Sequence, residues 1–161
     1  MTAFSHMRSD GSVCMVDVKD KPHTRRTAVA GGVVEVNAAT LDLLKRAALP
    51  KGDALVMARI AGIMAAKRTA ELIPLCHPLS LSYVEVRFEM QDDPPSIVVE
   101  AEARATGPTG VEMEALVAAQ TAADAIYDMC KAVQKDIVIR NMRLLYKCGG
   151  SSGEFHAGER D

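Results

Sequence analysis

A histidine and a cysteine lie side by side in the stretch ELIPLCHPLSL, residues 71–81, between two prolines. Pro74 and Pro78 fix φ and lack a backbone N–H, so neither a helix nor a regular strand runs comfortably through this stretch. Such a segment can hold the imidazole of His77 and its neighbouring backbone groups at one fixed place. A structural histidine with satisfied hydrogen bonds in apolar surroundings is the alternative interpretation.

A second group of candidate residues falls on one face of a long helix predicted over residues 112–135. At about 100° per residue, charged side chains gather in one narrow arc, opposite small apolar ones. The arc consists of Asp124, Asp128, Lys131 and Lys135. One interpretation is a solvated face with weak ion pairs. The other is a carboxylate, Asp128, kept ionised between ammonium groups, with Lys131 suited to proton transfer or phosphate binding.

Three weaker candidates are charged side chains in loops or at a predicted helix start. Lys51, in PKGD (50–53), precedes a helix N-terminus that favours anions, although the stretch is not a P-loop. Arg25–Arg26 is a candidate phosphate contact or a solvated pair. Glu112 and Glu114 lie in the first turn of the long helix, where stabilisation of the helix dipole alone explains two acids.

The elements that must position these residues follow the order β-β-α-α-β-β-α-β. Hydrophobic periodicity predicts strands at 12–18, 26–36, 81–90, 96–106 and 136–148, and helices at 41–49, about 53–72 and 112–135. Asn37, Thr40 and Asp53 are predicted N-caps, and Gly31–Gly32 is expected to mark a bulge.

The element order contains α-β-β-α-β, which predicts an α+β fold. We expect a ferredoxin-like sandwich, in which an antiparallel sheet carries helices packed on one face. In the two central predicted strands, 81–90 and 96–106, apolar residues alternate with Glu and Arg. The charged face of the sheet can therefore meet water or another subunit.

Length and composition limit the class of protein. The 161 residues predict a single domain, 1–161, whose polar ends, about 1–11 and 149–161, are expected to be mobile. A net charge of −2 and only three Phe and three Tyr argue against nucleic-acid binding. No signal peptide and no apolar run of membrane-spanning length is present. Four cysteines without metal-binding spacing predict free thiols in a cytoplasmic protein and no metal site.

Three separated segments, taken together, closely resemble the cyclic pyranopterin monophosphate synthase family of molybdenum cofactor biosynthesis. They are KGDALVMARIAGIMAAKRTAELIPLCHPL, TGPTGVEMEALVAA and AIYDMCKAVQKD, and the resemblance extends from MVDV (15–18) to GGSSG (149–153). It implies a ferredoxin-like fold and a homohexamer, a trimer of dimers with active sites at the dimer interfaces. It also implies a pyrophosphate-releasing phosphorus–oxygen lyase that converts 3′,8-cyclo-7,8-dihydro-GTP to cyclic pyranopterin monophosphate.

The resemblance implies roles for the residues at matching positions. Asp128 matches the assigned catalytic aspartate of the family, and Lys51 and Lys131 match its essential lysines. Substrate contacts are expected from Leu75, Cys76, His77, Met113 and Glu114, with Glu112 and Arg26 as further candidates. The chemistry requires charge stabilisation at the phosphates and proton transfers at the ring system. No cofactor is implied, although the triphosphate can carry Mg²⁺.

A function of another class stays open on the residues alone. Ferredoxin-like domains also act as small-ligand sensors and as oligomerisation modules, and a fold by itself does not choose among them. A sensor needs a pocket but not the constellation of Lys51, Asp128 and Lys131. Binding of a nucleotide without its conversion would indicate a sensor.

Overall fold

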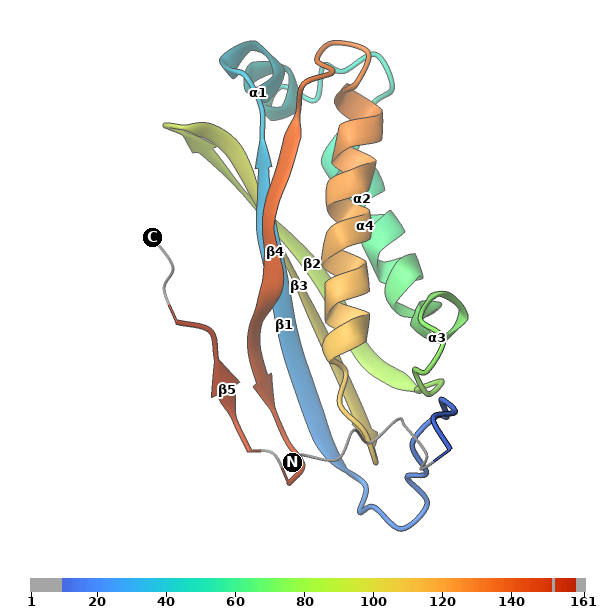
Figure 1. The fold of residues 1–161 in the computed structure, drawn as a ribbon. Coiled ribbons are helices and arrows are strands. Elements are labelled where there is room, and N and C mark those ends of the chain that lie inside the picture. The colour runs from blue at the N-terminus through green and yellow to red at the C-terminus, as the bar shows by residue number, and fades with distance from the viewer. Residues whose placement is uncertain (1–9, 152, 159–161) are drawn as a thin grey trace.

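A computed structural model describes residues 10–151 and 153–158 of the chain (Figure 1). Within these ranges, one antiparallel sheet has the strand order β2-β3-β1-β4-β5. The elements in chain order are β1 (Thr24–Glu35), α1 (Ala38–Lys45), α2 (Ala54–Ala66), α3 (Thr69–Leu72), β2 (Leu81–Asp92), β3 (Pro95–Gly107), α4 (Glu112–Cys130), β4 (Val138–Cys148) and β5 (Phe155–His156). The order β4-β1-β3-β2 with two helical crossovers is the ferredoxin-like arrangement, so the predicted α+β class is confirmed.

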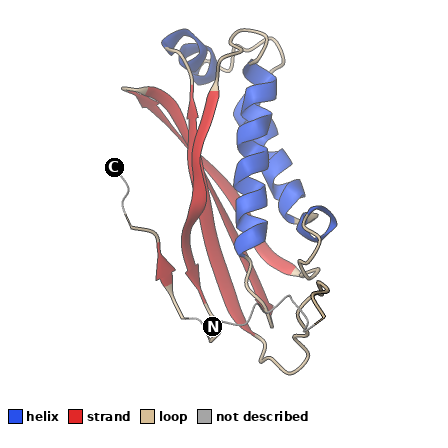
Figure 2. Cartoon of the chain, in the orientation of Figure 1, coloured by secondary structure: helices blue, strands red, loops and turns tan. Residues whose placement is uncertain are grey.

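The helices α2 and α4 pack side by side on one face of the sheet, and none of the described helices covers the opposite face (Figure 2). The buried side of α4 is built from alanines, and Ala115, Ala119 and Ala122 are fully buried. Small side chains let the α4 backbone lie close to both neighbours. At the contact with α2, a Cβ added to Gly62 would lie 2.8 Å from the Ala118 carbonyl oxygen.

Several local predictions are confirmed. The side chain of Asn37 accepts from the N–H of Thr40 at 2.8 Å, and that of Asp53 accepts from the N–H groups of Leu55 and Val56. Thr40, the alternative cap, lies inside α1 and is buried. The pairing of β1 with β4 shifts register between Gly31 and Val33, as the predicted bulge requires.

The face of the sheet without helices carries a network of ion pairs. Arg87 binds Glu85 at 2.6 Å and Glu102 at 3.2 Å, and Arg104 binds Glu102 at 2.6 Å. The guanidinium of Arg104 also stacks over the ring of Tyr83 at 4.5 Å. The alternating charges predicted for this face are therefore largely neutralised within the chain. Whether this face meets water or a subunit remains a prediction.

The predicted strand at 12–18 is wrong. Only Val13 forms an isolated bridge, and the rest of this segment is irregular. Its apolar side chains do not join a sheet face, because Val16 and Val18 line a cavity instead. Near the other end of the chain, β5 pairs with β4 in a stretch for which the sequence indicates no regular element.

The predicted ends of two helices are also corrected. The helix expected over 53–72 breaks at Lys67–Arg68, where the N–H of Arg68 bonds to the Ala65 carbonyl in a tight turn. The helix expected over 112–135 ends at Cys130, and the chain leaves it through a turn in which the N–H of Val133 bonds to the Cys130 carbonyl three residues back. Across the described ranges, no helix is both long and apolar enough to cross a membrane.

We predict that Gly62→Ala destabilises the protein, although alanine favours helix by about 1 kcal/mol over glycine. The added methyl meets a backbone oxygen of α4 that cannot rotate away, and overpacking of this kind costs about 1–3 kcal/mol. Urea unfolding should show a net loss of up to about 2 kcal/mol, the overpacking cost less the gain in helix propensity. Gly158→Ala, which meets nothing within 4 Å, is the control. Greater stability of Gly62→Ala would contradict the close approach of the two helices.

Candidate active site

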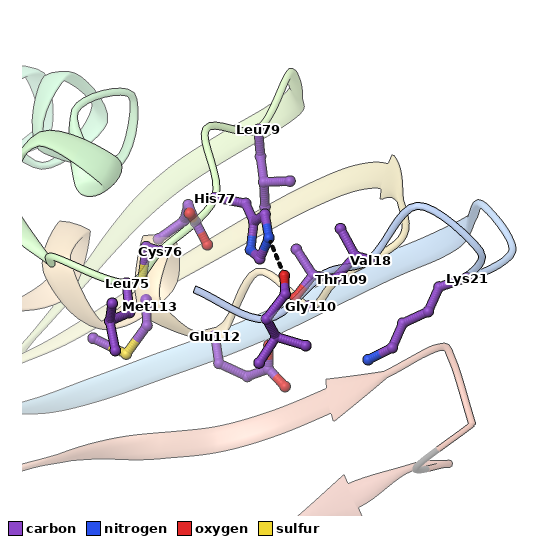
Figure 3. A pocket seen from close by; sticks show the side chains of 12 residues that line it. Val18, Lys21, Leu75, Cys76, His77, Leu79, Thr109, Gly110, Glu112 and Met113 are labelled. Carbon is purple, nitrogen blue, oxygen red and sulfur yellow. Dashed lines mark hydrogen bonds between the residues drawn. The ribbon is translucent and has the colours of Figure 1, made fainter. Parts of the chain in front are cut away.

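A cavity of about 310 Å³ lies where the start of α4 meets the segment after α3 (Figure 3). Both segments expected to contact substrate, 75–77 and 112–114, line it, although they come from different elements. The lining residues are Val16, Val18, Lys21, Leu75, Cys76, His77, Leu79, Thr109, Gly110, Glu112, Met113 and Glu114. Six of the seven residues predicted to bind substrate are therefore brought together.

The carboxyl group of Glu114 is the most buried charge-bearing group of the cavity, in a residue that is 4% exposed. Burial raises the pKa of Glu114, and the neighbouring charge of Glu112 raises it further. Burial also raises the pKa of the Cys76 thiol, with a smaller effect from Glu114. Both groups hold their protons more firmly than in water, because burial disfavours their charged forms.

Glu112 lines the cavity, and its carboxylate is paired with a lysine. The ammonium of Lys147 on β4 lies 2.9 Å from its carboxylate oxygen. A Cβ on Gly110 would lie 1.9 Å from the Glu112 Oε2 atom, so only glycine allows the carboxylate to fold over the loop. Gly110 in the TGPTG turn therefore leaves room for the acidic side chain of Glu112.

The imidazole of His77 is half-buried in the cavity wall. Its Nε2 atom lies 2.8 Å from the Val16 carbonyl oxygen, the bond drawn as a dashed line in Figure 3. The N-terminal segment therefore contacts the predicted substrate-binding histidine directly.

Arg26 does not line this cavity. Its guanidinium donates to the Gly107 and Pro108 carbonyls, each at 3.3 Å, and so holds the loop that leads into α4. A Cβ on Gly150 would overlap the Arg26 guanidinium, which shows how closely the chain after β4 passes over it. Arg26 therefore contacts the loop that leads into α4 and not the cavity itself.

The three residues predicted to be catalytic form a second cluster. Lys51, in the loop between α1 and α2, donates to the Asp128 Oδ2 atom at 2.9 Å and to the Asp128 carbonyl at 2.8 Å. Lys131 lies 2.6 Å from the Asp128 Oδ1 atom. Hydrogen bonds from Lys131 and Lys51 lower the pKa of Asp128 to about 2. Asp128 in turn raises the pKa of Lys131.

The two clusters lie at opposite ends of α4 (Figure 1). Glu114 is in the first turn and Asp128 in the last, about 21 Å apart along the axis at 1.5 Å per residue. The cluster around Asp128 is about half exposed and does not line the cavity. Within a single chain, the two groups of residues that the resemblance assigns to one site are therefore far apart.

A family model described as the MoaC family matches residues 15–150. The chain belongs to the MoaC family. It is 72% identical to the cyclic pyranopterin monophosphate synthase of Nitratidesulfovibrio vulgaris, over 96% of each chain. It is 69% identical to the synthase of Oleidesulfovibrio alaskensis, over 97% of this chain and 98% of the relative. It is 61% identical to that of Desulfovibrio desulfuricans, over 99% and 98%.

For this MoaC-family chain, sequence reasoning missed several residues of the cavity. Val16 and Val18 fall within the strand predicted at 12–18, and Lys21 lies in the basic stretch KDKPHTRR, residues 19–26, that follows it. Lys147, the partner of Glu112, lies within a predicted strand and gave no signal of its own. The basic composition of residues 19–26 is the one feature of the sequence that could have indicated Lys21.

We predict that the Asp128 carboxyl titrates near pH 2 in the wild type, followed by carboxyl-carbon NMR. Lys131→Met removes the largest cause of the shift and should raise the midpoint toward the ordinary value of 3.8, whereas Lys51→Met should raise it less. Because the folded pKa is lowered, the stabilisation is present above pH 4 and lost as the pH falls toward 2. Lys135→Met is the control, and an unchanged midpoint in Lys131→Met would refute the assignment.

Proposed function

We propose that the chain is a cyclic pyranopterin monophosphate synthase, which converts 3′,8-cyclo-7,8-dihydro-GTP to cyclic pyranopterin monophosphate and releases pyrophosphate in molybdenum cofactor biosynthesis. The observation that carries the proposal is the convergence of segments 75–77 and 112–114 on one cavity. Relatives that are 61% to 72% identical over nearly the whole chain bear this name.

The phosphates of such a substrate require cations, which this acidic chain supplies locally. When a hydroxyl oxygen attacks the α-phosphorus, the bond to the pyrophosphate oxygen breaks and negative charge grows on the leaving group. Lys131 is suited to stabilise that charge, because Asp128 raises its pKa and favours the ammonium form. Lys51 and the cavity residue Lys21 are the other cations proposed for this role.

Asp128 is proposed to orient the two lysines and not to act as a base. A carboxylate with a pKa of about 2 accepts protons poorly near neutral pH, because efficient general bases have pKa values near the working pH. Its contacts with both ammonium groups instead fix their separation. Proton transfer at the ring system is assigned to the cavity, where His77 and Glu114 lie.

A complete site is proposed to form between two copies of the chain. Along α4, the distance of about 21 Å separates the phosphate-binding lysines from the ring-binding cavity within one chain. The cavity, about 310 Å³, also lies at the lower end of the range for ligand pockets. A partner that brings its Lys51–Asp128–Lys131 cluster to this cavity would join the two groups.

The outer face of α2 is the surface proposed to meet the partner, within a hexamer that is a trimer of dimers. Val56, Met57, Ile60 and Met64 lie on this face, and each is 45–50% exposed. Large apolar side chains gathered on one helix face are typical of an interface between subunits. The helix packs directly against α4, which carries Glu114 in its first turn and Asp128 in its last.

Two further features of the enzyme are proposed. Any Mg²⁺ is expected to arrive with the triphosphate, because no three described His, Cys, Asp or Glu side chains lie close enough together to hold a metal ion. The cytoplasm is the proposed location, since Cys76, Cys130 and Cys148 are free thiols.

We predict that purified protein releases pyrophosphate from the cyclic dihydro-GTP intermediate. Lys51→Ala and Lys131→Ala should each lower kcat by about 10²–10⁴-fold, the range for loss of a catalytic acid or charge-stabilising group. Lys135→Ala, on the same helix-end surface, is the matched control, and light scattering checks the assembly. Near-normal turnover by either variant in an intact assembly would refute the assignment. Binding without turnover by the wild type would indicate a sensor.

We also predict that two inactive variants restore each other's activity when they share an assembly. His77→Ala damages the cavity, and Asp128→Asn damages the other cluster. When the two variants form a pair, an intact cavity from one chain can therefore meet an intact cluster from the other. The variants are co-expressed with different tags and purified over both, and turnover is compared with each variant alone. If the mixed assembly is as inactive as its parents, each site is built within one chain and the intersubunit proposal fails.

A further inference from the structure

The segment before β1 is irregular backbone, and two of its apolar side chains line the cavity. Val16 and Val18 line the cavity, whereas Val13 and Met15 on the same segment are 66% and 48% exposed. The segment thus turns one set of side chains inward and the other to solvent. This places the main chain of residue 16 against the imidazole of His77.

The contact between Val16 and His77 determines which ring nitrogen carries the hydrogen. A backbone carbonyl oxygen has no hydrogen to donate, so at 2.8 Å the Nε2 atom of His77 must be the donor. In a neutral imidazole only one nitrogen is protonated, so Nδ1 then carries a lone pair. The neutral ring is held as the Nε2–H tautomer.

The second ring nitrogen is left for a bound molecule. Within the described residues, Nδ1 of His77 has no hydrogen-bond partner, and it is not among the fully buried polar atoms. The ring lines the cavity together with the titratable side chains Lys21, Cys76, Glu112 and Glu114. Nδ1 is therefore the nitrogen that can reach a ligand in this space.

We propose that Val16 is a positioning residue, whose backbone carbonyl holds His77 as the Nε2–H tautomer so that Nδ1 accepts a proton from the substrate. The catalytic part of this inference rests on the proposed function. In that step Nδ1 takes a proton from an N–H or O–H group of the substrate, whose electron pair stays on the substrate. The resulting imidazolium keeps its Nε2–H bond to the carbonyl, which stabilises the positive charge.

The carbonyl cannot be removed by changing a side chain, so the test dislodges the segment. Val16→Gly/Val18→Gly removes the two apolar contacts that hold it against the cavity and loosens the backbone. Val13→Gly/Met15→Gly makes the same kind of change at the two exposed positions and is the matched control. Both are full-length chains, and circular dichroism and light scattering establish that they fold and assemble alike.

The first measurement is the tautomer itself, and it is independent of activity. Long-range ¹H–¹⁵N correlation NMR of protein labelled at its four histidines distinguishes the tautomers, and His77→Gln identifies the His77 signal by its loss. We expect the Nε2–H pattern in the wild type and control, and a mixture of tautomers in Val16→Gly/Val18→Gly. An Nδ1–H pattern in the wild type overturns the inference even if the protein is an active synthase.

The second measurement is a double-mutant cycle in pyrophosphate release. We expect Val16→Gly/Val18→Gly to lower kcat about tenfold, the order of one lost hydrogen bond, with little change in KM. In a His77→Gln background the same change should cost nothing further, because Val16 acts through His77. If the losses in kcat add, the segment has only a structural role and the inference is overturned. If the wild type lacks turnover altogether, the proposed function fails, while the NMR result still decides the tautomer.

Discussion

The close approach of α4 to the sheet and to α2 is the constraint on which the rest of the structure depends. A stripe of fully buried alanines and the contact at Gly62 fix the helix against its neighbours. Because packed interiors transmit displacements, a shift of α4 would move Glu114 at one end and Asp128 at the other. The same packing leaves the apolar outer face of α2 uncovered. One helix contact therefore positions both ends of α4 and leaves an apolar face of α2 exposed.

The pKa values of the carboxyl groups at the two ends of α4 shift in opposite directions. Near its N-terminus, the helix dipole favours carboxylates, but this effect is typically only 0.3–1 kcal/mol. Burial is the larger influence on Glu114, so its pKa rises instead. At the exposed C-terminal end desolvation is weak, and two ammonium groups lower the pKa of Asp128 to about 2. The chain thus places a buried carboxyl group with a raised pKa at one end of the helix and an exposed cluster of ion pairs at the other.

The sequence predicted the elements that depend on short-range patterns. Alternation in β2 and β3 and the caps at Asn37 and Asp53 determine those elements locally, and all are present. The error at 12–18 has a different cause, since a short apolar run can line a cavity as well as join a sheet, and only tertiary contacts decide. The residue patterns indicated most of the candidate site residues, and the resemblance assigned their roles. Neither could indicate that Asp128 and Glu114 lie at opposite ends of one helix, nor that the Val16 main chain contacts His77.

The position of Glu114 and Asp128 on one uninterrupted helix restricts how this chain can change in length. Inserting one residue within α4 would rotate everything after it by about 100° and advance it by about 1.5 Å relative to Glu114. The alanine stripe and the Asp128 carboxylate would then face new directions together. The tight connection between β2 and β3, residues 93–94, is not part of α4, so a change of length there rotates neither Glu114 nor Asp128. By contrast, α4 behaves as a segment of fixed length.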